Sequence, residues 1–320
     1  MKFDVRRDFD ERLLQVEASD LHRFLTGPTV FDLRRNGVQP FFVSTLLHGN
    51  ETSGWDAVRR FIADTSDASI VLFIGNVRAA AQAMRHLPDE VDFNRIWRQQ
   101  PWRDDLNDLL ERYQPWCGID IHNNSGPNPH YSVITDQHES TLALASIFSN
   151  RVIFTHHTLD ILAHAISPHC PSLTVETGTV DDLQSAQRAY DLLTRLNEIR
   201  RVPMSPKHEL EAYETIGIVK VEHENGSLEN FPQFDETLKE SSFSTLAAGS
   251  PFVNCLPSGW RVSVLDPAHS LDLTDEFFEF RERRAFLKRE IVMSMFTHTP
   301  ILALQDCVCY FLTSTSLARG

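Results

Sequence analysis

Short apolar segments alternate with amphipathic segments between residues 41 and 201, and this alternation limits the fold more than any other feature of the chain. Apolar runs predict strands, and apolar residues at helical spacing predict helices. We expect strands at 41–47, 70–74, 118–122, 131–135, 151–155 and 173–175, and helices at 54–63, 106–113, 141–148 and 181–201. Such an alternation predicts an α/β fold, with helices on both faces of a mostly parallel sheet.

The two ends of the chain have a different character. Residues 9–25 have apolar side chains at helical spacing, and Asn36-Gly37 separates two apolar runs. Both residues tolerate positive φ, so this pair predicts a hairpin. After Pro203 the segments become strand-like, at 213–221, 252–255, 260–265, 290–295 and 302–311. We therefore expect a larger α/β domain over residues 1–203 and a smaller β-rich domain over residues 204–320.

Charge and composition narrow the class of protein. The formal net charge is −14, which argues against nucleic acid as a partner. The N-terminal segment has no apolar core of a signal peptide, and no apolar run approaches the roughly 18 residues of a membrane span. The five scattered cysteines are typical of reduced thiols, so we expect a cytoplasmic protein that does not enter a membrane. The sequence leaves open whether the protein forms a homo-oligomer.

The expected strand at 41–47 ends on the sequence His48-Gly49-Asn50-Glu51. In open α/β sheets, ligands bind at the carboxyl ends of the strands. A histidine and a glutamate three residues apart can bind one cation, and zinc accepts both kinds of ligand. The alternative is a surface turn in which Ser53 caps the next helix and Glu51 is solvated.

The strand at 118–122 also ends on polar residues, with Asp120 and His122 on the same side of the strand. His122 is the candidate third ligand. Two histidines and a glutamate leave a fourth zinc position for water, which is the pattern of catalytic zinc sites. We expect Asp120 to orient His48, because the second nitrogen of a metal-bound histidine usually donates to a carboxylate or a carbonyl. The alternative is that Asp120 and His122 cap the next element.

A third strand, at 173–175, is followed directly by Glu176. A carboxylate beside an activated water can take its proton and pass it to a leaving amine. Glu176 is therefore the candidate general base. The alternative is that Glu176 caps the helix that begins near Asp181.

The three motifs HGNE, DIHNN and VETG lie between residues 41 and 178, where the chain resembles the aspartoacylase/succinylglutamate desuccinylase family, which is related to the zinc carboxypeptidases. The resemblance implies a carboxypeptidase-like mixed sheet flanked by helices, with a smaller β-rich C-terminal domain. It also implies one Zn²⁺ per chain, bound by His48, Glu51 and His122, and a catalytic role for Glu176.

Residues 75–95 are similar to another family segment, G-N-P…R…D-x-N-R. The resemblance implies that Arg85 polarises the scissile carbonyl, and that Asn94 and Arg95 bind a substrate carboxylate. The planar guanidinium of arginine suits bidentate binding of a carboxylate. The alternative for each arginine is a surface ion pair, which is the interpretation we favour for Arg78.

These residues predict a zinc-dependent amidohydrolase, a deacylase that cleaves an N-acyl amino acid or a similar small amide with a carboxylate. A carboxypeptidase-like enzyme for short peptides and a non-catalytic binding domain are the alternatives. Residues 156–175, directly before Glu176, contain no arginine or tyrosine and instead hold four histidines, His156, His157, His164 and His169. The acyl specificity of the family is therefore not part of the prediction.

Overall fold

The computed structural model describes residues 3–155, 160–225 and 228–317. The chain forms two compact units. The first contains Met1–Asn123, His130–Glu211 and Leu317–Gly320, and the second contains Asn124–Pro129 and Ala212–Ser316. The division into domains of residues 1–203 and 204–320 stays a prediction, which limited proteolysis would test.

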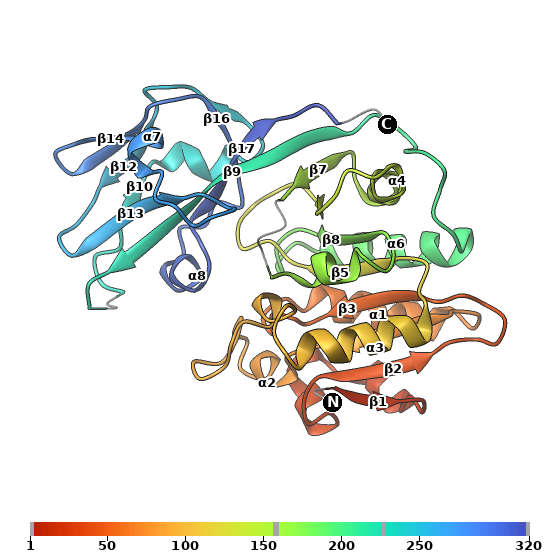
Figure 1. The fold of residues 1–320 in the computed structure, drawn as a ribbon. Helices are drawn as coiled ribbons and strands as arrows, with labels where there is room; N and C mark the ends of the chain where they lie inside the picture. Colours follow the sequence, from red (N-terminus) through yellow and green to blue (C-terminus); the bar gives the residue numbers. More distant parts are fainter. Residues whose placement is uncertain (1–2, 156–159, 226–227, 318–320) are drawn as a thin grey trace. The chain divides into compact units, whose positions relative to one another are not determined.

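The first unit contains a mixed sheet in the order β1-β2-β4-β3-β5-β8-β6-β7 (Figure 1). Antiparallel pairing is confined to β2 with β4 and β6 with β8, and the other neighbours in this order pair in parallel. The predicted mostly parallel sheet is thus confirmed. The strands are β1 (Asp4–Arg6), β2 (Thr29–Leu33), β3 (Phe41–Thr45), β4 (Ile70–Ile74), β5 (Gly118–His122), β6 (Tyr131–Ile134), β7 (Arg151–Phe154) and β8 (Ser172–Glu176).

Helices cover both faces of this sheet. Phe41 of β3 contacts Phe61 of α1, with ring centroids 6.3 Å apart. The next residue, Phe42, belongs instead to a buried cluster with α3 and α5. Because successive strand residues point to opposite faces, α1 lies on one face and α3 and α5 on the other. The helices are α1 (Ser53–Asp64), α2 (Val77–Ala80), α3 (Trp102–Tyr113), α4 (Glu139–Phe148), α5 (Leu162–Ile166) and α6 (Ser185–Ile199).

Two expectations for the N-terminal part are wrong. β2 pairs with β4 rather than with β3, so Asn36-Gly37 is not a hairpin turn. Gly37 has a φ of 78°, but Asn36 does not adopt the positive φ that a type I′ turn requires. Residues 9–25 form two short 3₁₀ helices, η1 (Glu11–Gln15) and η2 (Ala18–Arg23), in place of one longer helix. A third 3₁₀ helix, η3, spans Phe93–Arg95.

The second unit consists of two antiparallel sheets around an aromatic core. One sheet has the order β9-β17-β16-β11 with β13 beside β9, and the other has the order β10-β12-β15-β14. Phe252 and Phe311 come from different sheets, and their ring centroids lie 5.4 Å apart. The elements are β9 (Glu211–His223), β10 (Gln233–Phe234), η4 (Glu236–Glu240), β11 (Thr245–Leu246), β12 (Pro251–Cys255), β13 (Trp260–Leu265), α7 (Thr274–Phe277), β14 (Phe278–Arg281), β15 (Arg284–Leu287), β16 (Ile291–Ser294), α8 (Pro300–Gln305) and β17 (Cys309–Ser314).

The segment 302–311 differs from the expected strand. Its first part is α8, which begins at Pro300, and only the part from Cys309 is a strand. Proline has no backbone N–H, but the N–H of the first helical residue has no partner within the helix anyway. Proline therefore suits the first position of α8. No helix in the described part of the chain is long and apolar enough to cross a membrane.

Candidate active site

Three parallel strands bring the predicted site residues to one edge of the sheet. β5 lies between β3 and β8, and His122 at the end of β5 is the register partner of Glu176 at the end of β8. The loop after β3 carries His48 and Glu51 to the same edge. The ligand atoms of His48, Glu51 and His122 all lie within 4.8 Å of one another.

The loop after β3 has a backbone that few residue types permit. Leu46 has a φ of 58°, which turns the chain away from the strand direction. A Cβ atom on Gly49 would lie 2.1 Å from the backbone nitrogen of Ala80, so the loop can approach α2 only with glycine at this position. The Glu51 N–H then donates to the His48 carbonyl at 3.1 Å. This tight turn directs both side chains to the same side.

Both histidines direct their Nδ1 atoms at the carboxylate of Glu51. His48 Nδ1 lies 2.8 Å from Oε1, and His122 Nδ1 lies 2.7 Å from Oε2. All three side chains are buried, so Glu51 is not the solvated residue of a surface turn. Two imidazole nitrogens and a carboxylate that converge in this way form a donor set suited to zinc.

The other nitrogen of each histidine contacts an aspartate. His48 Nε2 lies 3.1 Å from Asp92 Oδ1, and His122 Nε2 lies 2.9 Å from Asp120 Oδ2. An Nε2–H that donates to a carboxylate leaves the Nδ1 lone pair available to a metal. The expectation that Asp120 orients His48 is therefore wrong. Asp120 lies two residues before His122 on the same side of β5, and the partner of His48 is Asp92, to which sequence reasoning assigned no role.

Charge balance in the cluster also fits a cation. Burial raises the pKa of Glu51, but the two histidines lower it by more than burial raises it. The pKa of Glu51 therefore lies well below its usual range. Burial lowers the pKa of His122, but Asp120 and Glu51 raise it well above its usual value. A proton on His122 thus balances part of the negative charge of the buried carboxylates. A divalent cation bound to the two Nδ1 atoms would balance the same negative charge.

Glu176 differs from the other carboxylates of the site. Its side chain is buried, and its Oε2 atom has no hydrogen-bond partner among the described residues. Burial raises the pKa of Glu176 to about 8. α6 begins only at Ser185, with Gln184 at its N-cap, so Glu176 does not cap that helix. A buried carboxyl with a shifted pKa beside a ligand cluster is typical of a functional acid or base.

Sequence reasoning also overlooked Tyr131. This buried residue of β6 is the antiparallel register partner of Glu176. Register partners point to the same face of a sheet, so Tyr131 lies beside Glu176. The pairing joins strands that are distant in sequence, and no local motif marks it.

Arg85 lies against the cluster. Its Nε donates to Asp92 Oδ2 at 3.0 Å, and its Nη1 lies 3.9 Å from Glu51 Oε1. The side chain is buried, unlike that of Arg78, which forms an exposed ion pair with Glu90 at 3.0 Å. A buried guanidinium that is hydrogen-bonded to Asp92 is positioned to act on a neighbouring charge.

Asn94 and Arg95 lie beside the cluster. Asn94 Nδ2 is 3.5 Å from His122 Nε2, and Asn94 Oδ1 accepts from the Leu162 N–H at 2.9 Å. Arg95 Nη1 donates to the Asn94 carbonyl at 2.7 Å. Asn94 therefore has a structural contact with the start of α5 in addition to its place near His122.

Asn123 joins the loops that form the site. Its N–H donates to Glu51 Oε2 at 3.1 Å. Its side-chain amide donates to Ser53 Oγ, Thr177 Oγ1 and the Gly178 carbonyl at 2.9, 3.2 and 2.8 Å, and its Oδ1 accepts from the Ser53 N–H at 3.2 Å. The residue is buried. One amide thus connects the loops after β3, β5 and β8, a role that the sequence motif alone does not indicate.

The histidines before Glu176 have no common place in this arrangement. His156 and His157 lie outside the described residues. His169 Nε2 contacts Asn107 Oδ1 at 3.0 Å in an exposed position, and His164 is a half-buried residue of α5. The described part of this stretch therefore adds no metal ligand to the cluster.

Residues 41–197 match the family model of the succinylglutamate desuccinylase/aspartoacylase catalytic domain. None of the curated proteins matches the chain significantly. The match covers the strands that carry His48, Glu51, His122 and Glu176. The match thus bears out the family resemblance that the motifs predicted.

Solved structures of similar fold cover most of the chain. Murine aminoacylase 3 has a TM-score of 0.61 at 14% identity, over 88% of this chain and 97% of that chain. Succinylglutamate desuccinylase from Vibrio parahaemolyticus has a TM-score of 0.58 at 16% identity, over 87% and 82%. The product-bound ectoine utilization protein EutE (DoeB) from Ruegeria pomeroyi has a TM-score of 0.58 at 13% identity, over 90% and 88%. At these identities the likeness is one of fold.

Proposed function

We propose that this protein is a zinc-dependent deacylase that hydrolyses the amide bond of an N-acyl amino acid or a similar small amide bearing a carboxylate. The observation that carries the proposal is the convergence of two histidine Nδ1 atoms and a glutamate carboxylate beside the unpartnered, buried carboxyl of Glu176. The family match supports the same reaction class. A binding domain has no need of a buried carboxyl at this position.

The donor set fits a metal that the family implies. His48, Glu51 and His122 would hold zinc, with Asp92 and Asp120 fixing the two imidazoles through their Nε2 atoms. When bound there, zinc would polarise the scissile carbonyl, acidify the attacking water and lower the pKa of the nearby Glu176 carboxyl.

Glu176 would act as the general base. The water oxygen attacks the carbonyl carbon of the amide, and the water proton passes to a carboxylate oxygen of Glu176. The C–N bond then breaks, and Glu176 delivers the proton to the leaving nitrogen, so that the products are a carboxylate and an amine. The absence of a hydrogen-bond partner for Oε2 among the described residues leaves this oxygen available for the transfer.

Arg85 and Arg95 would act on the negative charges of the substrate. The buried guanidinium of Arg85, held by Asp92, would stabilise the charge that develops on the carbonyl oxygen. Arg95, with Asn94 beside it, would bind the substrate carboxylate through its planar fork. Arg95→Lys should therefore raise KM for carboxylate substrates more than it lowers kcat.

A substrate panel tests the proposal. Metal-loaded wild-type protein and Glu176→Gln are incubated with N-acyl amino acids that differ in the acyl group, with the matching amides that lack the carboxylate, and with short peptides. Free amine is then measured. We expect wild-type protein to hydrolyse at least one N-acyl amino acid and Glu176→Gln to be nearly inactive. Cleavage of peptides alone would establish the carboxypeptidase-like alternative, and equal activity of the two proteins would overturn the role of Glu176.

A further inference from the structure

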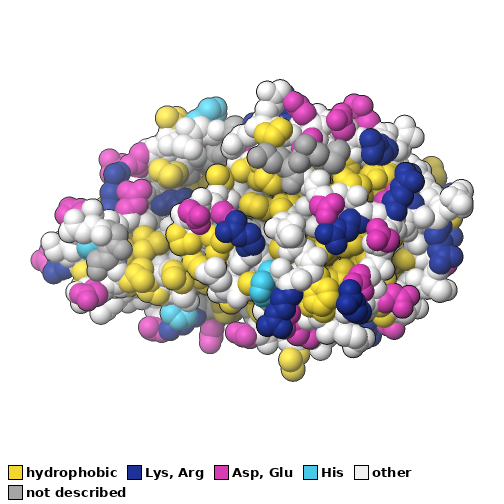
Figure 2. All heavy atoms as spheres, turned by 90° about the horizontal axis from the view of Figure 1, so that it is seen from below, with side chains coloured by type: hydrophobic (Ala, Val, Ile, Leu, Met, Phe, Trp, Pro, Cys, Tyr) yellow, Lys and Arg dark blue, Asp and Glu magenta, His cyan; other side chains and the backbone are white. Residues whose placement is uncertain are grey.

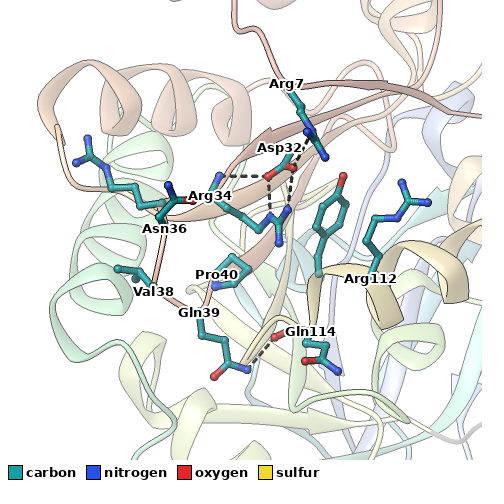
Figure 3. Close-up of a pocket in the computed structure, with 12 residues that line it drawn as sticks. Arg7, Asp32, Arg34, Asn36, Val38, Gln39, Pro40, Arg112 and Gln114 are labelled. Carbon is teal, nitrogen blue, oxygen red and sulfur yellow. Dashed lines mark hydrogen bonds and ion pairs between the residues drawn. The ribbon is translucent and has the colours of Figure 1, made fainter.

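The edge of the sheet opposite to the candidate active site carries a pocket of about 660 Å³ that the proposed reaction does not use. It lies where β3 begins, beside Pro40, and where α3 ends, beside Tyr113 and Gln114. Four arginines line it, Arg7, Arg34, Arg35 and Arg112, together with one carboxylate, Asp32. Figure 3 shows the pocket between the loop that precedes β3 and the end of α3. We call this cavity, with its four arginines, the arginine pocket.

The walls of the arginine pocket are held by hydrogen bonds. The Gln39 amide donates to the Gln114 carbonyl at 2.7 Å and so connects the loop to the end of α3 (Figure 3). The buried Ser69 Oγ accepts from the Arg35 N–H at 3.1 Å and donates to the Val38 carbonyl at 3.0 Å. The loop therefore has a defined backbone on which the arginines stand.

Arg34 and Asp32 form paired hydrogen bonds with each other. Arg34 Nε and Nη2 donate to the two oxygens of Asp32 at 2.7 and 3.0 Å, and the guanidinium lies 4.3 Å from the ring centroid of Tyr113. The side-chain hydrogen bonds from Arg34 hold the pKa of Asp32 below its usual value. The one carboxylate of the pocket is thus bonded to Arg34, and it reaches a second guanidinium, that of Arg7, only at 3.8 Å.

The remaining arginines have few interactions within the chain. Arg35 and Arg112 form no side-chain ion pair with any described residue, and both are exposed. Arg7 is 84% exposed and reaches Asp32 only at 3.8 Å. Such a group of weakly paired arginines is unexpected in a chain with a net charge of −14, in which acidic side chains outnumber basic ones. On the face drawn in Figure 2, basic and acidic side chains are interspersed.

From this geometry we propose that the arginine pocket binds a small anion that carries phosphate groups. Guanidinium groups bind phosphate oxygens with paired hydrogen bonds, and several of them around one cavity favour an anion with more than one negative charge. A second hollow, of about 560 Å³, shares Arg34 and Arg35 and adds Arg200, which forms an ion pair with Asp67 in the same lining. Because Tyr113 is buried, its ring offers no exposed face for stacking, so the phosphate groups supply the affinity.

Calorimetric titration with inorganic phosphate, ADP and adenosine tests the proposal on the metal-loaded protein. We expect saturable binding of phosphate and tighter binding of ADP, because ADP carries more negative charge. Adenosine, which lacks phosphate, should give no binding. Both affinities should fall with added salt, because the arginines are exposed and their charges are screened.

The variant Arg35→Gln/Arg112→Gln locates the binding. It should weaken ADP binding by about tenfold or more, since each lost guanidinium removes charge-assisted hydrogen bonds. Arg35→Lys/Arg112→Lys, which keeps the charge but loses the fork, should give an intermediate affinity. The control Arg23→Gln/Arg103→Gln removes two exposed arginines elsewhere and should change the affinity less than about twofold.

Three results would overturn the proposal. They are no saturable binding of either phosphate compound, equal affinity of ADP for wild-type protein and Arg35→Gln/Arg112→Gln, and binding of adenosine as tight as that of ADP. Phosphate that binds at the histidine and glutamate cluster instead would survive the pocket substitutions. The outcome does not depend on the proposed deacylase reaction.

Discussion

Two sites of opposite character lie at the two ends of β3 and β5. At their carboxyl ends lie buried histidines and carboxylates whose atoms bond to one another, and at their amino ends lies the arginine pocket with its exposed guanidiniums. Burial makes the first site sensitive to each single charge, because an unpaired buried charge is costly. Exposure makes the second site tolerant, because water solvates each guanidinium. The same strands therefore support one site in which substitutions affect stability and chemistry, and one in which they affect ligand binding.

The largest effect expected from this contrast is that of Glu176→Gln. Loss of the general base should lower turnover by about 10²- to 10⁴-fold, while the metal content stays the same. Turnover and metal content are measured on the same preparation. Glu111→Gln, which changes an exposed glutamate of α3, is the control and should leave turnover unchanged. Turnover of Glu176→Gln equal to that of wild-type protein would place the base elsewhere.

Asn123→Ala should have the next largest effect, on stability. The change removes the side-chain hydrogen bonds to Ser53, Thr177 and Gly178 and leaves buried polar groups without partners. We expect the free energy of unfolding to fall by roughly 2–4 kcal/mol in urea titrations. Asn107→Ala, which removes one exposed hydrogen bond to His169, should cost about 0.5 kcal/mol or less. Equal losses in both variants would contradict the role assigned to Asn123.

Much of the carboxyl edge could be predicted from sequence, because β3, β5 and β8 each end on a polar motif and parallel neighbours bring such ends together. The hydrogen-bond partner of His48 could not be predicted from the sequence. Asp92 lies in a loop far along the chain, and only tertiary folding brings it to the histidine. The hairpin prediction failed for a similar reason, since β4 inserts between β2 and β3.

The arginine pocket was not predictable from any motif. Its arginines come from separate segments at residues 7, 34, 35 and 112, and each looks like an ordinary surface residue in the sequence. Net charge argues only against nucleic acid as a partner and does not reveal a single basic pocket, because it averages over the whole surface. A site built from exposed side chains of distant segments becomes visible only when the fold is known.

Asp92→Asn and Asp120→Asn sharpen the account of the buried site. Each change weakens the hydrogen bond that orients one imidazole, at His48 or His122. We expect zinc affinity to fall by about 10- to 100-fold in each variant, measured by competition with a chelator. Asp104→Asn, at an exposed position of α3, is the control. Unchanged affinity in both variants would show that the imidazoles need no such support.

The smallest effects should come from the arginine pocket. Arg35→Gln/Arg112→Gln should change the free energy of unfolding by about 0.5 kcal/mol or less, because the two side chains are exposed and form no ion pair with the described residues. Turnover should be the same as in wild-type protein. Urea titration and steady-state kinetics measure the two quantities. A stability loss as large as that of Asn123→Ala would break the contrast between the two edges.

The metal content of the purified protein tests the central claim most directly. The account predicts about one zinc per chain in wild-type protein and in Glu176→Gln, and little zinc in His48→Ala/His122→Ala. Inductively coupled plasma mass spectrometry gives the ratio, and circular dichroism shows whether each variant is folded. Full zinc content in the double-histidine variant, or full activity of folded wild-type protein without metal, would contradict the account.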